Sequence, residues 1–294
     1  LQNGNVGIGS STPVGKLSIV GTLAITQSAT NSIVIGDISG DFRGLNAIDI
    51  QSYRSAADKV AGGYNTTLIG QDNKASNCYT DGCVAIGASN LIDSGYQGTA
   101  IGVLNSARGN WATAIGNNNY TDYAVDRALA VGSENDAMYH GATAIGSYNY
   151  VFGVNSTAVG RSNTVGDDGA DLYLGAFGSQ NTVLNSRGHA FGYLNSVTAD
   201  DAFAIGNNIT NTTTGAFQFG PDNATKVTIL SNGRFGIGTT SPTASFTLVG
   251  TSTVNPFVVA SSTGSSLFTI LQNGNIGIGS STPSRTLTVA GSLG

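Results

Sequence analysis

The chain has 294 residues, 42 of them glycine, and only 10% are charged, against about 25% in an average globular domain. Its net charge is −5 and its lysines and arginines form no cluster, which argues against a nucleic-acid partner. Hydrophobic residues make up 40%, which excludes a disordered acidic tail, and no apolar run approaches the roughly 18 residues of a membrane helix, so we expect no membrane contact in this segment.

Residues 1–63 form the first predicted region, an N-terminal hairpin collar with a connecting segment. Its opening motif, NGNVGIGSSTP at residues 3–13, recurs twice near the other end of the chain. Because residue 1 enters within that motif, we expect the chain to be part of a longer protein whose export signal and anchor lie elsewhere. The stretch at residues 55–61 (SAADKVA) is the only one that favours a turn or two of helix, ended by Gly62 and Gly63.

The second region, residues 64–223, consists of tandem copies of the pattern Ala-[Ile/Val/Phe]-Gly-x-x-Asn. From Gly70 to Gly220 the spacings between successive repeat glycines are 17, 15, 14, 16, 14, 14, 18, 14, 14 and 14 residues. Fourteen residues suffice for one flat coil of two short strands and two tight turns. The repeat therefore predicts an all-β, parallel β-roll (a solenoid) whose coils stack at about 4.8 Å.

Residues alternate in size along the first strand of each coil. Two and four positions before the repeat glycine the residue is small, as at Ala114 and Ala112, whereas Ile115 and Thr113 are larger. Period-two alternation places the two sets on opposite faces of a strand. One face fits a narrow interior that admits only methyl groups, and the other needs a second surface to cover it, which predicts oligomerisation along the whole roll.

The larger residues directly before the repeat glycines form the predicted subunit-interface stripe. Its members are Ile86, Ile101, Ile115, Val131, Ile145, Val159, Phe177, Phe191, Ile205 and Phe219.

The asparagine three positions after the glycine suits a left-handed turn, and stacked copies predict a ladder of side-chain amides. Its members are Asn90, Asn105, Asn119, Asn135, Asn149, Asn163, Asn181 and Asn195. Ordinary turn chemistry alone does not explain a recurrence as regular as this one.

Cys78 and Cys83 lie five positions apart in the longest of the early coils, in a Gly/Asn-rich loop. A close pair without other cysteines fits an oxidising compartment and a local disulfide that closes the insertion. A metal site is the alternative, but His140 and His189 are distant in sequence.

Residues 224–294 form the third region, the C-terminal collars. The NGxxGIGxxxP motif recurs at residues 232–242 and 273–283, and alternating strands precede both copies. Strand, Asn-Gly, strand is a hairpin signal. Such hairpins are too small to hold a core alone, which predicts collars intertwined with other copies of the chain.

No set of residues has the composition of an active site, so we predict that the chain is not an enzyme and holds no cofactor and no catalytic or metal-binding residues. An acidic turn at residues 167–171 resembles a calcium loop in composition but not in spacing. A cluster of aromatics offers a candidate ligand-binding strip, with subunit packing as the alternative reading. Its members are Trp111, Tyr120, Tyr123 and Tyr139.

The tandem Ala-Ile-Gly-x-x-Asn copies resemble the head repeats of trimeric autotransporter adhesins, the YadA-like head, over about residues 64–223. The flanking Asn-Gly hairpins, and the stretch from Ala47 to Gly62, look like segments of bacteriophage tail fibres and large bacterial surface fibre proteins. The resemblance implies a left-handed roll, an intertwined homotrimer, and adhesion. The roll is followed by hairpins and not by a heptad-patterned stalk, which favours a long fibre of alternating rolls and collars.

We therefore expect a structural and adhesive segment of a trimeric extracellular fibre, on a cell surface, that attaches to a surface, cell or matrix through an unknown glycan or protein receptor. A phage tail fibre with a receptor-binding role keeps the same fold and is the first alternative. A secreted β-solenoid carbohydrate-active enzyme is the second, and the sparse charge argues against it.

Overall fold

The structure is a computed structural model that describes residues 5–8, 17–19, 33–36, 43–76, 78, 82–93, 96–122, 126–167, 173–221 and 226–291. These residues form strands and turns and contain no helix, so none of them forms a helix able to span a membrane. The short helix expected at residues 55–61 was wrong. That stretch is a series of turns whose end is held by the solenoid, since Ala75 N donates to Val60 O at 3.2 Å and Gln51 Nε2 donates to Lys59 O at 3.0 Å.

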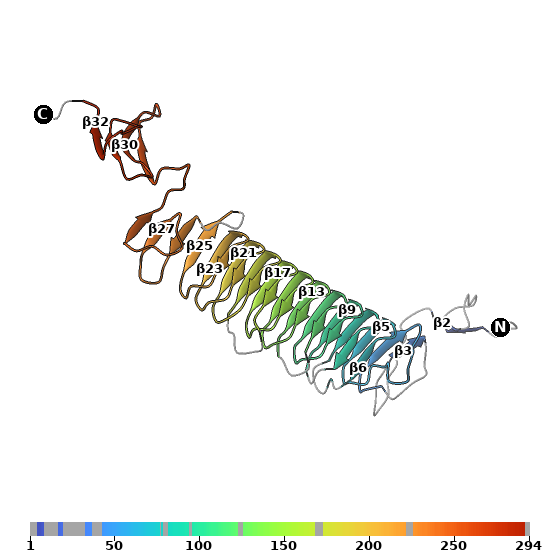
Figure 1. Ribbon diagram of the computed structural model, residues 1–294. Coiled ribbons are helices and arrows are strands. Elements are labelled where there is room, and N and C mark those ends of the chain that lie inside the picture. Colours follow the sequence, from blue (N-terminus) through green and yellow to red (C-terminus); the bar gives the residue numbers. More distant parts are fainter. Residues whose placement is uncertain are drawn as a thin grey trace.

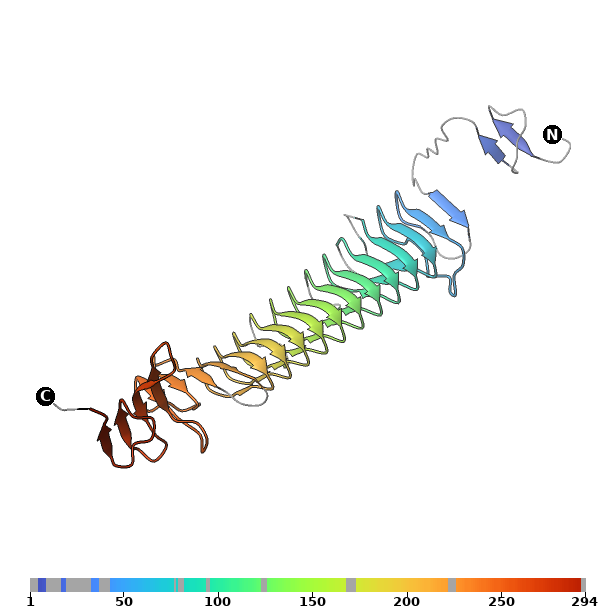
Figure 2. The ribbon, with the colours of Figure 1, turned by 90° about the horizontal axis from the view of Figure 1, so that it is seen from above.

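Most of the described chain is one long solenoid (Figures 1 and 2). Thirteen parallel strands form most of its larger sheet. They are β3 (Ile33–Gly36), β4 (Ile48–Gln51), β5 (Thr67–Gln71), β7 (Val84–Ala88), β9 (Thr99–Val103), β11 (Thr113–Asn117), β13 (Leu129–Ser133), β15 (Thr143–Ser147), β17 (Thr157–Arg161), β19 (Gly175–Ser179), β21 (His189–Tyr193), β23 (Phe203–Asn207) and β25 (Phe217–Gly220).

The second sheet has ten short parallel strands, one from each coil. They are β6 (Lys74–Ser76), β8 (Leu91–Asp93), β10 (Ser106–Ala107), β12 (Tyr120–Thr121), β14 (Asp136–Ala137), β16 (Tyr150–Val151), β18 (Thr164–Val165), β20 (Thr182–Val183), β22 (Ser196–Val197) and β24 (Thr210–Asn211).

The register of the larger sheet follows the repeat. Gly116 pairs with Gly102 on one side and Gly132 on the other, and the column of paired glycines runs from Gly70 to Gly220. The all-β solenoid with coils of about 14 residues is thereby confirmed. The left-handed sense of its coils and the trimer stay predictions.

The interior between the two sheets is narrow and mostly aliphatic. Ala114 and Ala144 of the larger sheet are fully buried, as their position two before the glycine predicted. The opposite wall is bulkier than expected: Val151 and Val165 of the second sheet are also fully buried. The interior therefore admits branched side chains, because alanine on one wall leaves room for valine on the other.

The repeat glycines are required by close approach as well as by backbone conformation. Gly146 has φ +121°, and a Cβ built on it would lie 1.9 Å from the carbonyl oxygen of Gly160 in the next coil. No side chain fits that gap, and L-residues rarely adopt this φ. Each repeat glycine thus sets how closely the next coil stacks.

The larger sheet continues at its C-terminal end through antiparallel strands. β25 pairs with β26 (Val227–Ile229), β26 forms a hairpin with β27 (Phe235–Ile237), and β28 (Phe246–Leu248) then pairs parallel to β27. A separate sheet contains β29 (Phe257–Ala260), β30 (Ser266–Ile270), β31 (Ile276–Ile278) and β32 (Leu287–Val289), with a second hairpin between β30 and β31.

The three copies of the NGxxGIGxxxP motif form the same unit. Near the N-terminus β1 (Val6–Ile8) pairs parallel to β2 (Leu17–Ile19), as β27 does with β28 and β31 with β32. In each unit the motif's Gly-Ile strand lies beside the strand that follows the proline. The intertwining of these collars with other chains stays a prediction.

The predicted domain limits at residues 64 and 223 also stay predictions, and the larger sheet crosses both. β3 and β4 pair in parallel with β5, so parallel stacking starts before residue 64. The three longest coils carry their extra residues mainly at 77–81, 123–125 and 168–172, which lie largely outside the described residues. The candidate calcium turn at residues 167–171 falls mostly there.

Replacing a glycine of the column tests this packing directly. We expect Gly146→Ala to lower the free energy of unfolding by at least about 4 kcal/mol, because the Cβ collides with backbone that cannot move without separating two coils. The matched control is Gly233→Ala in the β26–β27 hairpin, which also has positive φ (+80°) but nothing within 4 Å. It should cost about 1–2 kcal/mol. Urea unfolding followed by circular dichroism measures both, and equal losses would contradict the close-approach argument.

Candidate functional site

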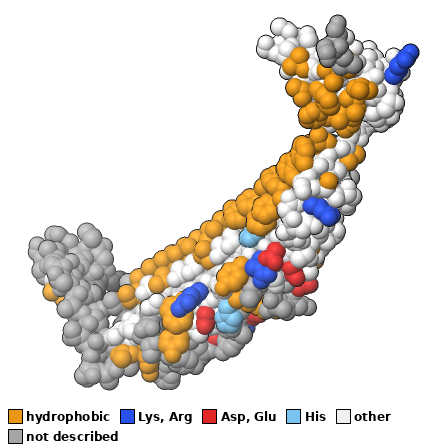
Figure 3. Space-filling view, turned by 90° about the vertical axis from the view of Figure 1, so that its left-hand side faces the viewer, with side chains coloured by type: hydrophobic (Ala, Val, Ile, Leu, Met, Phe, Trp, Pro, Cys, Tyr) orange, Lys and Arg blue, Asp and Glu red, His pale blue; other side chains and the backbone are white. Residues whose placement is uncertain are grey.

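The candidate site is the outer face of the larger sheet, where the ten stripe residues from Ile86 to Phe219 lie in one line. Register pairing places Ile115 beside Val131 and Phe177 beside Phe191, so consecutive members are strand neighbours. Ile86, Phe177 and Ile205 remain 36–38% exposed in the single chain. Figure 3 shows the resulting band of hydrophobic side chains along the solenoid. An apolar surface this continuous is unusual for a monomer.

The stripe becomes aromatic towards its C-terminal end. The rings of Phe177 and Phe191 stack at 5.0 Å between centroids, and Phe203 and Phe217 stack at 4.2 Å in the neighbouring column, three positions before the glycine. His189 lies in that second column and contacts Phe203 at 4.7 Å. Burial lowers the pKa of His189 below its ordinary value, because the half-buried ring is more easily accommodated without charge.

Beneath this face the ladder asparagines are buried, at most 1% exposed, and join successive coils. Asn149 Nδ2 donates to Ile145 O (3.1 Å) in its own coil and to Gly160 O (2.9 Å) in the next. Its Oδ1 accepts from both the backbone N (3.2 Å) and Nδ2 (2.9 Å) of Asn163. Every polar atom of the side chain is thus satisfied inside the solenoid, which removes the cost of burying it.

The ladder extends one rung beyond the predicted set and has distinct ends. Asn73 is also a rung, since its Oδ1 accepts from Asn90 N at 3.0 Å. Before it, Gln51 Oε1 accepts from Asn73 N at 2.6 Å and so replaces the missing asparagine. At the other end Ile209 takes the place of the next asparagine. Its backbone N donates to Asn195 Oδ1 at 3.0 Å, and its side chain has no amide to continue the ladder.

A buried ionic cluster closes the N-terminal end of the interior. Asp49 pairs with Leu68 of the next strand and therefore occupies the column that alanine fills elsewhere. Its carboxylate lies 2.9 Å from Arg43 Nε and 2.9 Å from Arg54 Nη2, and it accepts from Gln51 Nε2 at 3.0 Å. Sequence reasoning missed Asp49 and Gln51, because they lie outside the regular repeat. A polar pair in alternation with the isoleucines of β4 was the available signal.

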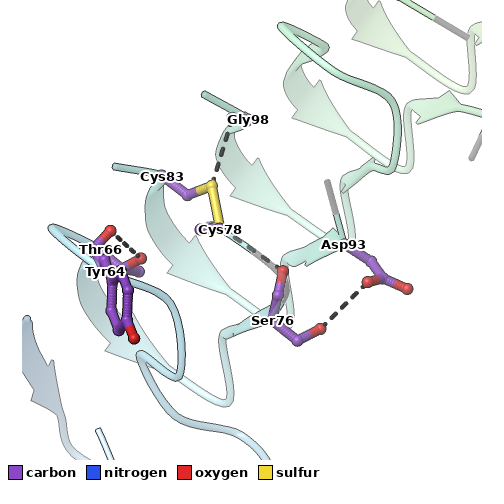
Figure 4. Close-up of a disulfide and its surroundings, with 7 residues drawn as sticks. All are labelled: Tyr64, Thr66, Ser76, Cys78, Cys83, Asp93 and Gly98. Carbon is purple, nitrogen blue, oxygen red and sulfur yellow. Dashed lines mark hydrogen bonds between the residues drawn. A yellow bond between two sulfur atoms is a disulfide. The ribbon is translucent and has the colours of Figure 1, made fainter. Parts of the chain in front are cut away.

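The two cysteines are joined by a disulfide, with 6.1 Å between their Cα atoms (Figure 4). Both are buried, and Cys83 occupies the position four before the repeat glycine, where half of the other coils have alanine. Its sulfur accepts a hydrogen bond from Gly98 N at 3.4 Å. The disulfide therefore packs inside the solenoid, and does not lie in an exposed loop. A metal site at these sulfurs is contradicted by the bond.

The candidate aromatics do not share one environment. Trp111 stacks on Tyr96 at 5.4 Å, beneath the guanidinium of Arg127. The hydroxyl of Tyr120 accepts from Arg108 Nη1 at 3.1 Å. Tyr139 packs against the interior, and Tyr123 lies outside the described residues. No ring contact joins Trp111, Tyr120 and Tyr139, so their role as a single ligand-binding strip stays a prediction.

Titratable side chains are scattered within the described residues. His140 Nδ1 lies 4.0 Å from Asp126 Oδ2 and accepts a hydrogen bond from the backbone N of Asp126. No three His, Cys, Asp or Glu side chains among the described residues converge on a point where a metal ion would bind.

The coils are stacked, joined by buried amides, and carry an apolar stripe on one face. These features define a β-solenoid repeat protein. The family model of the YadA head domain repeat (2 copies) matches residues 94–119, 140–163 and 190–208. The YadA-like head repeats recognised in the sequence are confirmed by this match. No curated protein and no solved structure matches the chain. Head repeats on a β-solenoid are typical of a structural adhesin and not of an enzyme, and the match gives no support to the phage tail-fibre alternative.

Interrupting the ladder should weaken the solenoid. We expect Asn149→Leu to lower the free energy of unfolding by about 2–4 kcal/mol, because Gly160 O and the amide of Asn163 lose partners in a buried interior. Asn117→Ala, an exposed asparagine on the larger sheet, is the matched control and should change stability by less than about 0.5 kcal/mol. Thermal and urea unfolding compare the two; similar small losses would show that the amides are dispensable.

Acid should destabilise the column next to the stripe at His189. Its pKa in the folded state lies below the unfolded value, so the unfolded chain binds the proton more readily. The neutral ring's contribution is complete above about pH 6.5 and is lost as pH falls through the folded pKa. His189→Thr introduces the commonest residue at this position of the repeat and should flatten this part of the stability–pH curve. Curves of equal slope between pH 7 and 5 for both proteins would refute the assignment.

Proposed function

We propose that the chain is a structural and adhesive segment of a trimeric extracellular fibre that attaches a cell to a surface, another cell or a matrix. The single observation that carries the proposal is the stripe of half-exposed Ile, Val and Phe side chains over ten consecutive coils. A chain that repeats one apolar contact every coil is built to lie along copies of itself.

Three copies around a common axis suit this geometry. The stripe gives the solenoid one continuous apolar face, and three such faces turned inwards enclose one continuous core. The antiparallel hairpins beyond β25 would then lock the chains together at the C-terminal end. The head-repeat match supports this reading, since the YadA-like heads to which the repeats are similar belong to trimeric adhesins of the cell surface.

The apolar face holds the chains together in the assembly, and the surface that remains outside is the one that adheres. The second sheet faces away from the stripe and presents a different set of side chains in every coil. A rigid rod that repeats its backbone and varies its outer residues suits display of a receptor-binding surface away from a cell. The receptor is a glycan or a protein.

Charged substitutions in the stripe test the trimer. Ile115→Asp, Ile145→Asp and Ile205→Asp should each dissociate or unfold the assembly, because every copy would bury an unpaired carboxylate. Leu104→Asp is the matched control, since Leu104 is 54% exposed and lies at a turn outside the stripe. Light scattering coupled to size-exclusion chromatography gives the mass. A folded wild-type monomer, or a trimer that survives all three substitutions, would refute the proposal.

A further inference from the structure

The outer face of the second sheet is hollowed at one coil. The first hollow, of about 340 Å³, is lined by Tyr148, Tyr150, Arg161, Ser162 and Thr164. The second, of about 270 Å³, is lined by Phe152, Thr164, Gly166, Asp167 and Leu184. The two share Thr164, and we call them together the Thr164 groove.

The groove exists because side-chain size drops abruptly between two neighbouring coils. Residues 148, 150 and 152 are Tyr, Tyr and Phe, and fourteen positions later residues 162, 164 and 166 are Ser, Thr and Gly. The pairing of β16 with β18 places Tyr150 directly beside Thr164, and Phe152 N donates to Val165 O at 2.7 Å. The groove therefore has aromatic rings along one side, and hydroxyl groups and backbone at its base.

The groove differs from the rest of the roll in its charge. Among the described arginines of the solenoid, Arg54 pairs with Asp49, Arg187 pairs with Asp201, and Arg127 covers Trp111. The exposed guanidinium of Arg161, at one end of the groove, makes no hydrogen bond or ion pair with any described residue. The Asp167 carboxylate lies at the other end.

We propose that the Thr164 groove binds an oligosaccharide that carries a carboxylate, with the acid at Arg161. Aromatic faces such as Tyr150 and Phe152 stack on the C–H faces of sugar rings, and Ser162 and Thr164 exchange hydrogen bonds with ring hydroxyls. Arg161 holds the carboxylate in paired, charge-assisted hydrogen bonds.

A protein strand fits this place less well. β16 and β18 are paired on both sides, so the groove offers no free backbone edge for strand addition. A ligand must therefore be recognised by side chains alone. Apart from Arg161, which ends β17 of the larger sheet, the groove lies on the second sheet, away from the stripe, so Tyr150, Phe152 and Thr164 stay open to solvent when the stripe is covered.

The test uses the whole chain and two hexasaccharides in isothermal titration calorimetry. One alternates glucuronic acid and N-acetylglucosamine; the other is its carboxyl-reduced form. Arg161→Gln should weaken binding of the acidic sugar by about tenfold and leave the reduced sugar unchanged. Tyr150→Ala should weaken both by about fivefold or more. The controls are Arg127→Gln and Tyr173→Ala, an exposed arginine and an exposed tyrosine outside the groove, which should bind as wild type.

Several outcomes would contradict the proposal that the groove binds an acidic oligosaccharide. They are no binding of either sugar, unchanged binding by Arg161→Gln and Tyr150→Ala, or equal losses in the two controls. A Glu-Gly peptide of the same charge that binds as tightly as the acidic sugar would overturn the carbohydrate assignment. The inference rests on the adhesive function proposed above, and light scattering of the same samples separates the two. A trimer that binds no sugar refutes only the groove, and a monomer that binds it refutes only the trimer.

Discussion

Adjacent coils of this protein meet where the carbonyl oxygen of one repeat glycine lies over the α-carbon of the preceding one. The same oxygen accepts the side-chain amide of the preceding asparagine, as Gly160 O does from Asn149. Glycine makes the approach sterically possible and asparagine makes it favourable, so the two residues of the motif form a single contact. Weakening either one should loosen the stacking of the two coils, since the glycine approach and the amide bond meet at the same carbonyl oxygen.

The rest of the solenoid follows from that contact being repeated in register. Because the repeat glycines are aligned in one column, the residues directly before them form one line on the outside of the solenoid. The residues two positions before them form one line on the inside. Alanine inside and Ile, Val or Phe outside are then consequences of strand alternation. The outer face tolerates changes of size, as in the drift from Ile115 to Phe191, because nothing in the single chain limits it. An outer column that stays apolar from coil to coil fits the shared subunit interface proposed above.

The regular part of this structure could be predicted from the sequence, and the irregular ends could not. Period, strand alternation and the Gly–Asn spacing together define the coil, and they also gave the stripe and eight rungs of the ladder. In the coil of β4, Gln51 replaces the ladder asparagine and Asp49 replaces the interior alanine. The side chains and the coil length differ from those of the repeat, so the repeat pattern does not reveal them. The stretch at residues 55–61 contains helix-forming residues, but it is too short for their helix propensity to outweigh the hydrogen bonds to neighbouring coils.

The outer surface was the least predictable part, for a related reason. Trp111, Tyr120 and Tyr139 stand out in the sequence as aromatics, but each contacts a different partner once the coils are stacked. The Thr164 groove depends on the contrast between two coils fourteen residues apart, and no single residue in it is conspicuous. Side chains that face outwards from the second sheet do not enter the contact between coils. They are therefore free to vary from coil to coil. A binding surface of the kind proposed here can arise on this sheet without any change to the packing that holds the coils together.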